Sequence, residues 1–171
     1  MSEEVIINKV AESGLVTINL EDYLPLEEIV GFDIKDYLFM GLILKEKEFR
    51  QSLKEMDKEV YRNKIAAVYC SADAIIPMWA YMLISSTLKP FAKEVLMGDE
   101  KEAEKKQLIK NIHNIHTTEY SGKRLVIKGC GEKQIPEEAY LEITNILQPV
   151  AKSIMFGEPC STVPIYKQQA S

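Results

Sequence analysis

An internal similarity is the feature of this sequence that most constrains its fold. Residues 61–99 and 120–158 align without a gap at an offset of 59 positions, and 12 of the 39 aligned pairs are identical. The identical pairs are Tyr61/Tyr120, Lys64/Lys123, Ile76/Ile135, Pro77/Pro136, Ala80/Ala139, Tyr81/Tyr140, Ile84/Ile143, Leu88/Leu147, Pro90/Pro149, Ala92/Ala151, Lys93/Lys152 and Gly98/Gly157. A duplicated unit predicts that both segments adopt the same local structure.

Each segment has the pattern of a strand followed by a helix. The runs 64–70 and 123–129 are apolar, partly β-branched and bounded by turn residues, as is typical of strands. Pro77 and Pro136 then suit the first position of a helix, where the missing N–H is not needed. Apolar residues follow at a spacing of four, which predicts a helix face packed on a core. A short second strand ending in glycine completes each segment.

Strands that alternate with helices predict an α/β fold. We expect a mostly parallel sheet of about six strands with helices on both faces, built from the internal repeat. A helical pattern precedes the first strand of each segment, and residues 15–20 alternate as a strand does. We therefore expect one domain over residues 1–171, with a degenerate unit at about 5–41 and complete units at about 46–99 and 105–158.

Charge and hydropathy exclude two classes of partner. The net charge is −5 and no Lys/Arg stripe is free of acids, so we expect no nucleic-acid binding. The longest uncharged apolar run, residues 74–84, is far shorter than the ~20 residues that span a bilayer. The acidic start at residues 1–4 does not resemble an export signal, so we expect a cytoplasmic protein. Three cysteines in that setting predict free thiols.

The symmetry between the segments breaks on the outer face of the helix at 77–88. The second segment carries Glu137, Glu138 and Glu142 there, whereas the first carries Met78, Trp79 and Leu83. A helix that is apolar all round must be covered by another part of the protein. Either the N-terminal segment covers this face, or a second subunit does so in a twofold homodimer.

The three cysteines follow predicted strands. Cys70 ends one strand, Cys130 ends the equivalent strand one position later, and Cys160 lies three residues beyond Gly157. Ligands bind outside the carboxyl ends of parallel strands, so we expect the three thiols at one edge of the sheet. Three convergent thiolates would suit zinc or an iron–sulfur cluster. The alternative is that the cysteines pack as small, inert apolar groups.

Polar residues are expected at the same edge. Asp73, Glu132 and Glu158 are candidates for acids, bases or oxygen ligands, although solvated loop positions are the favoured explanation. Further pocket candidates in these loops are Ser71, Ser161 and Thr162. The sequence has no G-x-G-x-x-G motif or P-loop and hence no signature of a nucleotide site.

Three motifs resemble those of a known family. They are Tyr69-Cys-Ser-Ala-Asp-Ala-Ile-Ile-Pro77 with Trp79-Ala-Tyr-Met82, Lys128-Gly-Cys130, and Gly157-Glu-Pro-Cys-Ser-Thr-Val-Pro-Ile-Tyr-Lys167. They are similar to signatures of an uncharacterised bacterial family, domain of unknown function 2480, and the similarity covers nearly the whole chain. The resemblance implies genes near iron–sulfur assembly factors, and hence a thiol-based role in cluster assembly or maturation. Gly131 departs from the pattern, because the resemblance leads us to expect serine there.

Three functional hypotheses follow. The leading one is an accessory protein that binds a metal or iron–sulfur centre through Cys70, Cys130 and Cys160 and acts with iron–sulfur assembly proteins. The second is a non-catalytic, dimeric interaction module with inert cysteines. The third is a small-molecule enzyme that uses the acids at the sheet's carboxyl edge. The sequence names no substrate or reaction for any of them.

Overall fold

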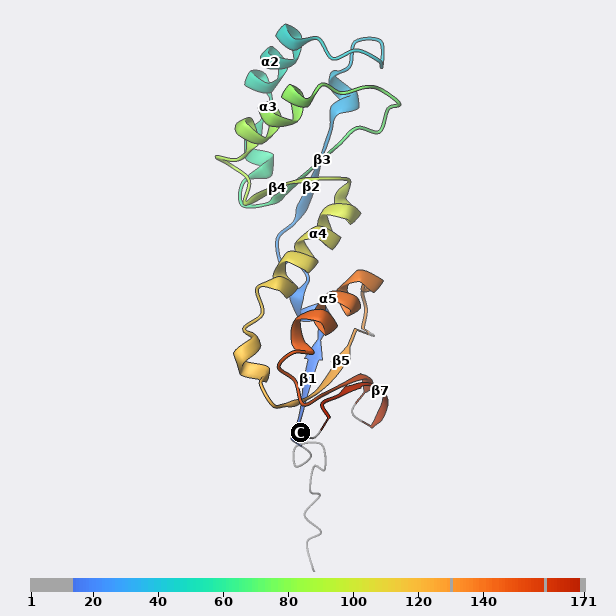
Figure 1. Ribbon diagram of the computed structural model, residues 1–171. Helices are drawn as coiled ribbons and strands as arrows, with labels where there is room; N and C mark the ends of the chain where they lie inside the picture. The colour runs from blue at the N-terminus through green and yellow to red at the C-terminus, as the bar shows by residue number, and fades with distance from the viewer. Residues whose placement is uncertain (1–13, 130, 159, 170–171) are drawn as a thin grey trace, which may run out of the picture. The chain divides into compact units, whose positions relative to one another are not determined.

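The computed structural model describes residues 14–129, 131–158 and 160–169 (Figure 1). The chain divides into two compact units, each with its own sheet and core. Unit 2 is the continuous segment 25–107, and unit 1 combines the residues up to Leu24 with those from Leu108 onward. Unit 2 is therefore inserted, in sequence, between the first strand of unit 1 and the rest of that unit.

Unit 2 contains a three-stranded parallel sheet with the order β2-β3-β4. Two α-helices and two short 3₁₀ segments accompany these strands. The elements in chain order are β2 (Ile29–Asp33), η2 (Ile34–Tyr37), α2 (Glu46–Glu55), η3 (Lys58–Tyr61), β3 (Ile65–Tyr69), α3 (Met78–Leu88) and β4 (Glu94–Met97).

The central strand of unit 2 is covered on both faces. Ala66 and Val68 of β3 belong to the main core cluster, which α2 and α3 complete on one face. Ile65 and Ala67 face the other way and pack with Ala103 near the start of α4 (Glu100–His113). Because successive residues of a strand point to opposite faces, an apolar run such as Ile-Ala-Ala-Val fits a strand buried on both sides.

Unit 1 contains a four-stranded sheet with the order β1-β5-β6-β7. Strands β1, β5 and β6 are parallel, and β7 is antiparallel to β6. The elements are β1 (Leu15–Asn19), η1 (Leu20–Tyr23), the end of α4, η4 (Thr117–Tyr120), β5 (Arg124–Lys128), α5 (Glu137–Leu147), β6 (Ser153–Glu158) and β7 (Ser161–Lys167). Leu108 and Ile112 of α4 pack with Ile143 of α5 against Leu125 and Ile127 of β5.

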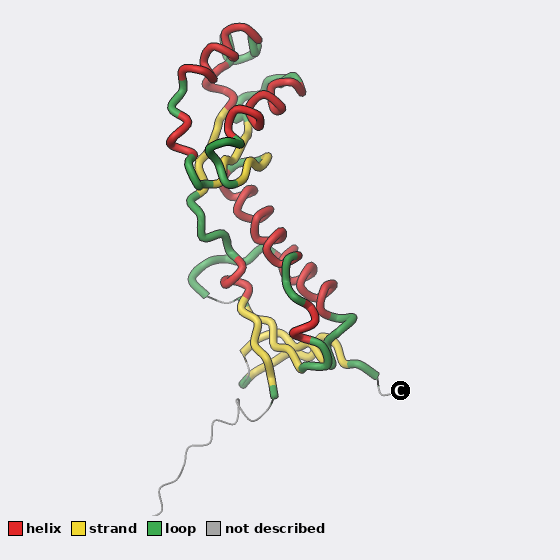
Figure 2. Tube along the Cα trace, turned by 90° about the vertical axis from the view of Figure 1, so that its left-hand side faces the viewer, coloured by secondary structure: helices red, strands yellow, loops and turns green. Residues whose placement is uncertain are grey.

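The α/β class and the mostly parallel pairing are confirmed, but the single six-stranded sheet is wrong. The strands form two separate sheets (Figure 2). Strand β1 pairs with β5 whereas β2 pairs with β3, so the segment expected to form one degenerate unit at 5–41 contributes strands to two different sheets. The end of that expected unit forms no strand, since Phe39 makes only an isolated bridge with Ile43. Local pattern sets where a strand forms, but tertiary packing sets its partner.

Several local predictions hold. Pro77 and Pro136 directly precede α3 and α5, and the runs at 64–70 and 123–129 contain β3 and β5. Strands β3 and β5, helices α3 and α5, and strands β4 and β6 each begin 59 residues apart. The chain forms two compact units, and the single domain over residues 1–171 stays a prediction.

The apolar outer face of α3 is partly covered from within unit 2. The Trp79 ring lies 6.2 Å from the ring of Phe49 in α2, and Trp79 and Leu83 are half-buried against the unit 2 core. Met78, in contrast, remains 72% exposed. The cover expected from the N-terminal segment or a second subunit is thus supplied at Trp79 by α2, and the homodimer stays a prediction.

Candidate functional site

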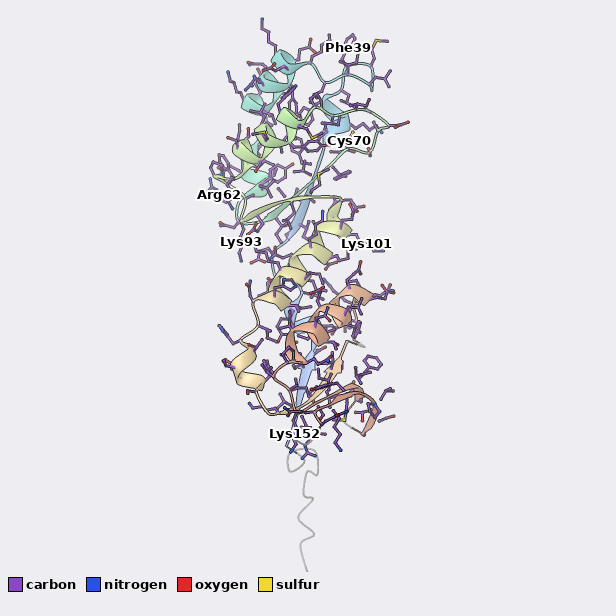
Figure 3. All side chains as sticks on the ribbon, in the orientation of Figure 1. Phe39, Arg62, Cys70, Lys93, Lys101 and Lys152 are labelled. Carbon is purple, nitrogen blue, oxygen red and sulfur yellow. The ribbon has the colours of Figure 1, made fainter. Side chains whose placement is uncertain are left out.

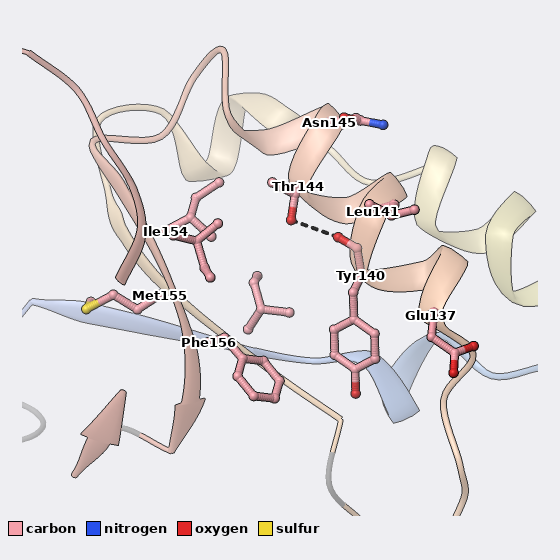
Figure 4. Close-up of a pocket in the computed structure, with 10 residues that line it drawn as sticks. Glu137, Tyr140, Leu141, Thr144, Asn145, Ile154, Met155 and Phe156 are labelled. Carbon is pink, nitrogen blue, oxygen red and sulfur yellow. Dashed lines mark hydrogen bonds between the residues drawn. The ribbon is translucent and has the colours of Figure 1, made fainter. Parts of the chain in front are cut away.

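An apolar pocket of about 640 Å³ lies in unit 1, between α5 and strands β6 and β7 (Figure 4). Small-molecule sites have volumes of roughly 300–1,000 Å³, so this pocket is of the size that such a ligand needs. The lining residues are Ile127, Glu137, Tyr140, Leu141, Thr144, Asn145, Ile154, Met155, Phe156 and Ile165.

Helix α5 builds one wall of the pocket because its two faces differ. Ala139, Ile143 and Leu147 are fully buried and hold the helix on the sheet. Tyr140 and Thr144, which follow Ala139 and Ile143 in the sequence, line the pocket instead. The helix is thus anchored by one apolar stripe and presents a second, mixed stripe to the pocket.

The hairpin of β6 and β7 forms the opposite side. Gly157 has φ +118° at the end of β6, and a Cβ there would collide with the carbonyl oxygen of Ser161. Glycine therefore permits the tight return of the chain into β7. Ile154 pairs with Tyr166 and Met155 with Pro164, so Ile165 is the extra residue of β7 at this irregularity, and it lines the pocket.

Apolar side chains of the pocket remain in contact with solvent. Leu141 is 65% exposed, Ile165 is 53% exposed and Phe156 is 37% exposed, while Ile154 is buried. Contiguous exposed apolar surface on a soluble protein marks interaction sites and ligand grooves. The exposed walls and the buried floor therefore give the pocket the character of a binding site for an apolar group.

Polar groups lie on the α5 side of the pocket. Figure 4 shows the Glu137 carboxylate and the Tyr140 hydroxyl at the same end of it. The Tyr140 and Phe156 rings pack edge to face at 5.8 Å, which fixes the position of the phenol. The Thr144 hydroxyl donates to the Tyr140 carbonyl at 2.7 Å and is thereby engaged within the helix. The arrangement suits a ligand with an apolar body and a donor or cationic group directed at Glu137.

Three of the residues predicted from the sequence lie in unit 2, after β3. Cys70 is half-buried against the core of that unit, and its thiol donates to the Ala72 carbonyl at 3.5 Å (Figure 3). Burial, together with the nearby Cys70 thiol, raises the pKa of Tyr81. Ser71 and Asp73 are exposed in the same loop. The Cys70 thiol is therefore partly buried and hydrogen-bonded within its own loop.

Ser71 is held by the end of the neighbouring strand. Its hydroxyl donates to one carboxylate oxygen of Asp33 at 2.5 Å, and its N–H donates to the other at 3.0 Å. Partial burial alone would raise the pKa of Asp33. The hydrogen bonds from Ser71 and from the Lys35 N–H outweigh burial and hold the pKa of Asp33 below its ordinary value. The pair ties the ends of β2 and β3 together.

The other predicted residues lie in unit 1. Cys160 is exposed in the turn between β6 and β7, where Glu158 pairs with Ser161 in the ladder. The Glu158 carboxylate also lies 3.6 Å from the ammonium of Lys128. Thr162 donates to the Met155 sulfur at 3.6 Å. The candidate residues of this hairpin therefore lie together.

Two further candidates follow β5. Glu132 is exposed in the loop that leads to α5. Cys130 lies outside the described residues, so the structure gives no contacts for it. Its position in the sequence is two residues after the end of β5.

The expected single edge for all three thiols is not formed. Strand β3, which precedes Cys70, belongs to the sheet of unit 2, while β5 and β6 belong to the sheet of unit 1. Among the described residues, no three His, Cys, Asp or Glu side chains gather as metal ligands would. Within the same part of the chain, every helix is too short or too polar to cross a bilayer.

Sequence reasoning missed the pocket and the strand that closes it. Pro164 makes a strand at 161–167 hard to recognise from the sequence, because proline is confined to sheet edges and irregularities. β7 is such an edge strand. Two signals for β7 and the pocket were present in the sequence. Val163 and Ile165 flank the proline with the spacing of one strand face, and Leu141 is an apolar residue on an otherwise acidic helix face.

The comparisons with known proteins identify the family. Residues 4–168 match the family described as Protein of unknown function (DUF2480), so the chain belongs to that family. The match confirms the resemblance found in the three motifs. No curated protein and no solved structure matches the chain.

Proposed function

We propose that the protein is a non-catalytic binding protein whose pocket in unit 1 holds a small apolar molecule. The observation that carries this proposal is the pocket of about 640 Å³ with its exposed Leu141, Phe156 and Ile165. The ligand class is an apolar body bearing a neutral donor or a cation. The exposed Glu137 carboxylate at one end disfavours an anion.

A fluorescence titration tests this proposal. The neutral dye N-phenyl-1-naphthylamine should bind with a saturable increase in emission. Ile165→Glu should raise the dissociation constant tenfold or more, which corresponds to a loss of roughly 1.4 kcal/mol of binding free energy. The matched control is Leu26→Glu, because Leu26 is an apolar residue of unit 2 that is 97% exposed. Equal affinities for the wild type and Ile165→Glu, or no saturable binding, would contradict the proposal.

The ligand class has its own test. The anionic dye 8-anilinonaphthalene-1-sulfonate should bind more weakly than the neutral dye, and Glu137→Gln should narrow that difference. If the affinities for the two dyes differ as much in Glu137→Gln as in the wild type, Glu137 does not select the ligand. The apolar pocket would then remain without a charge preference.

A second candidate function is a thiol site in unit 1. Strands β5 and β6 are parallel neighbours, and Cys130 and Cys160 each follow the end of one of them by two residues. Parallel neighbours end at the same sheet edge, which supports a shared zinc or iron–sulfur centre. We include Cys70 as the predicted third ligand and iron–sulfur assembly proteins as the predicted partners.

Metal analysis separates this second candidate from the first. Anaerobically purified protein should contain stoichiometric zinc or iron, and Cys130→Ser and Cys160→Ser should each remove it. Loss of metal in Cys70→Ser as well would support three ligands. Metal-free wild-type protein would reject the thiol site and leave dye binding in the pocket unaffected.

The two units are further inferred to be copies of one ancestral unit. The equal offset of 59 residues between three pairs of elements supports this inference, as do the identical residues at that offset. The inference matters for function because a feature that differs between the copies marks where one of them has specialised. Strand β7, which closes the pocket, is such a feature, because the sheet of unit 2 ends at β4 within the described residues.

A further inference from the structure

Two aromatic rings form adjoining parts of the unit 1 pocket. Tyr140 of α5 and Phe156 of β6 both line it, and their rings lie 5.8 Å apart at an interplanar angle of 77° (Figure 4). Phe156 is 37% exposed, so its contact with Tyr140 leaves part of the side chain open. The face of an aromatic ring carries the negative part of its quadrupole and attracts cations. Two nearly perpendicular rings therefore offer a cation a corner with two aromatic surfaces.

A carboxylate adds negative charge to the same pocket. Among the described residues that line it, Glu137 is the only charged one. Figure 4 shows the Glu137 carboxylate at the same end of the pocket as the hydroxyl of Tyr140. The carboxylate attracts a cation and repels an anion. Glu137 and the two rings thus favour the same kind of ligand group.

The rest of the lining favours one type of cation. Six of the lining side chains are apolar, and the uncharged polar ones are Tyr140, Thr144 and Asn145. A primary ammonium carries three N–H donors that need acceptors, and leaving them unpaired is costly in apolar surroundings. An ammonium whose hydrogens are replaced by methyl groups has no such requirement and presents an apolar surface. The methylated cation is therefore the better match to this lining.

The equivalent positions of unit 2 do not combine these groups. At the offset of 59, the counterparts of Glu137, Tyr140 and Phe156 are Met78, Tyr81 and Met97. Unit 2 thus has one of the two rings at these positions, and neither the second ring nor the carboxylate. The aromatic corner with its carboxylate is a property of the unit that has the pocket.

We infer that the pocket binds a small molecule with a methylated ammonium group, held between the rings of Tyr140 and Phe156 and facing Glu137. The inference rests on the proposed function, because it names the ligand class of the same pocket. In this arrangement the methyl groups contact the rings and the carboxylate balances the charge. The apolar body of the ligand occupies the space beside Ile154 and Ile165.

Three related ligands test the inference. They are benzyltrimethylammonium, its neutral isostere neopentylbenzene, in which carbon replaces the nitrogen, and benzylammonium, which lacks the methyl groups. Displacement of bound N-phenyl-1-naphthylamine gives the affinity of each. Phe156→Leu removes a ring and keeps an apolar side chain, so it should weaken benzyltrimethylammonium at least about threefold and change neopentylbenzene by less than about twofold. Glu137→Gln should show the same selectivity, and the wild type should bind benzylammonium more weakly than benzyltrimethylammonium.

The matched control is Leu141→Met. It changes an apolar side chain of the same pocket without altering a ring or a charge, so its effects on the cation and on the neutral isostere should be equal. Urea denaturation should show that Phe156→Leu remains folded, because Phe156 is partly exposed.

The outcomes separate this inference from the proposed function. If the dye binds but Phe156→Leu weakens the cation and the isostere equally, the inference is overturned and the apolar pocket stands. Benzylammonium binding as tightly as benzyltrimethylammonium would likewise overturn the methylated cation. If the dye itself does not bind, the proposed function and the inference fail together.

A lipid headgroup is a second source of the same cation. Phosphocholine carries a trimethylammonium group close to a phosphate, and co-sedimentation with phosphatidylcholine vesicles tests for it. We expect no co-sedimentation, because the Glu137 carboxylate disfavours the neighbouring phosphate. Vesicle binding that Phe156→Leu abolishes would overturn the assignment to a small molecule.

Discussion

The phenol of Tyr140 packs directly against the backbone of Gly129, so closely that a Cβ at residue 129 would collide with the hydroxyl and lie 3.2 Å from Ile135 Cγ1. Tyr140 also lines the unit 1 pocket. The glycine at the end of β5 therefore helps to set the position of a pocket wall. In unit 2 the residue at the equivalent position is Cys70.

Gly129→Ala should displace the Tyr140 ring and narrow the pocket. Overpacking of this kind costs about 1–3 kcal/mol of unfolding free energy. Urea denaturation and dye titration measure the two effects, and both should change. Gly129→Ala with Tyr140→Leu should recover part of the stability, because the shorter side chain leaves room for the methyl group. If Gly129→Ala alone matches the wild type in both measurements, the contact does not position Tyr140.

Trp79→Ala should destabilise unit 2 because Trp79 packs on Phe49 of α2 and on the core. Removal of a half-buried aromatic ring is expected to cost about 2–3 kcal/mol. The matched control is Met78→Ala at an exposed neighbouring position, with an expected change within about 0.5 kcal/mol. Thermal or urea unfolding measures both variants. A destabilisation that appears only at concentrations where the protein dimerises would instead place Trp79 at a subunit contact.

Ser71→Ala should raise the pKa of Asp33, because it removes a hydroxyl donor to the carboxylate. A lowered carboxyl pKa stabilises the folded state above the unfolded value of 3.8 and loses that effect as pH falls through the folded value. The variant should therefore be less stable at pH 7, by at most about 1 kcal/mol because the pair is exposed, and should approach the wild type in acid. An NMR pH titration of the Asp33 carboxyl measures the shift. Ser71→Thr, which keeps the hydroxyl, should behave as the wild type does.

The raised pKa of Tyr61 predicts that the folded state loses stability at alkaline pH. Burial, with smaller contributions from Tyr37 and Tyr69, raises the pKa of Tyr61 from 10.0 to about 12, and its hydroxyl donates to the Gly31 carbonyl at 3.2 Å. The stabilisation is complete below pH 10 and is lost as pH rises through about 12, because the unfolded chain ionises first. Tyr61→Phe should be about 1 kcal/mol less stable at pH 7, and the gap should narrow between these pH values. The measurement is the free energy of unfolding of the wild type and of Tyr61→Phe as a function of pH. A constant difference between the two proteins across this pH range would contradict the prediction.

Local elements were predictable from the sequence, whereas sheet assignment was not. Pro77 and Pro136 mark helix starts through backbone chemistry that acts within a few residues. The pairing of Leu15 with Arg124, and of Ile29 with Ile65, depends on which core each strand joins. No pattern within β1 or β2 specifies that choice.

The candidate site was predictable only in part. The sequence analysis placed Cys160, Ser161 and Thr162 in a loop after the strand that ends at Gly157, but Ser161 and Thr162 begin strand β7. It did not reveal β7, whose pairing with β6 creates the pocket wall at Ile165. The pocket is lined by residues of four elements, β5, α5, β6 and β7, that packing brings together, so no single stretch of sequence carries its pattern.

The most direct test of the proposed function is a ¹H–¹⁵N NMR titration of the whole chain with N-phenyl-1-naphthylamine. If the unit 1 pocket binds apolar molecules, the largest chemical-shift changes will occur at Leu141, Ile154, Phe156 and Ile165, and Ile165→Glu will suppress them together. Changes confined to residues 25–107, or no saturable changes at all, would contradict the account.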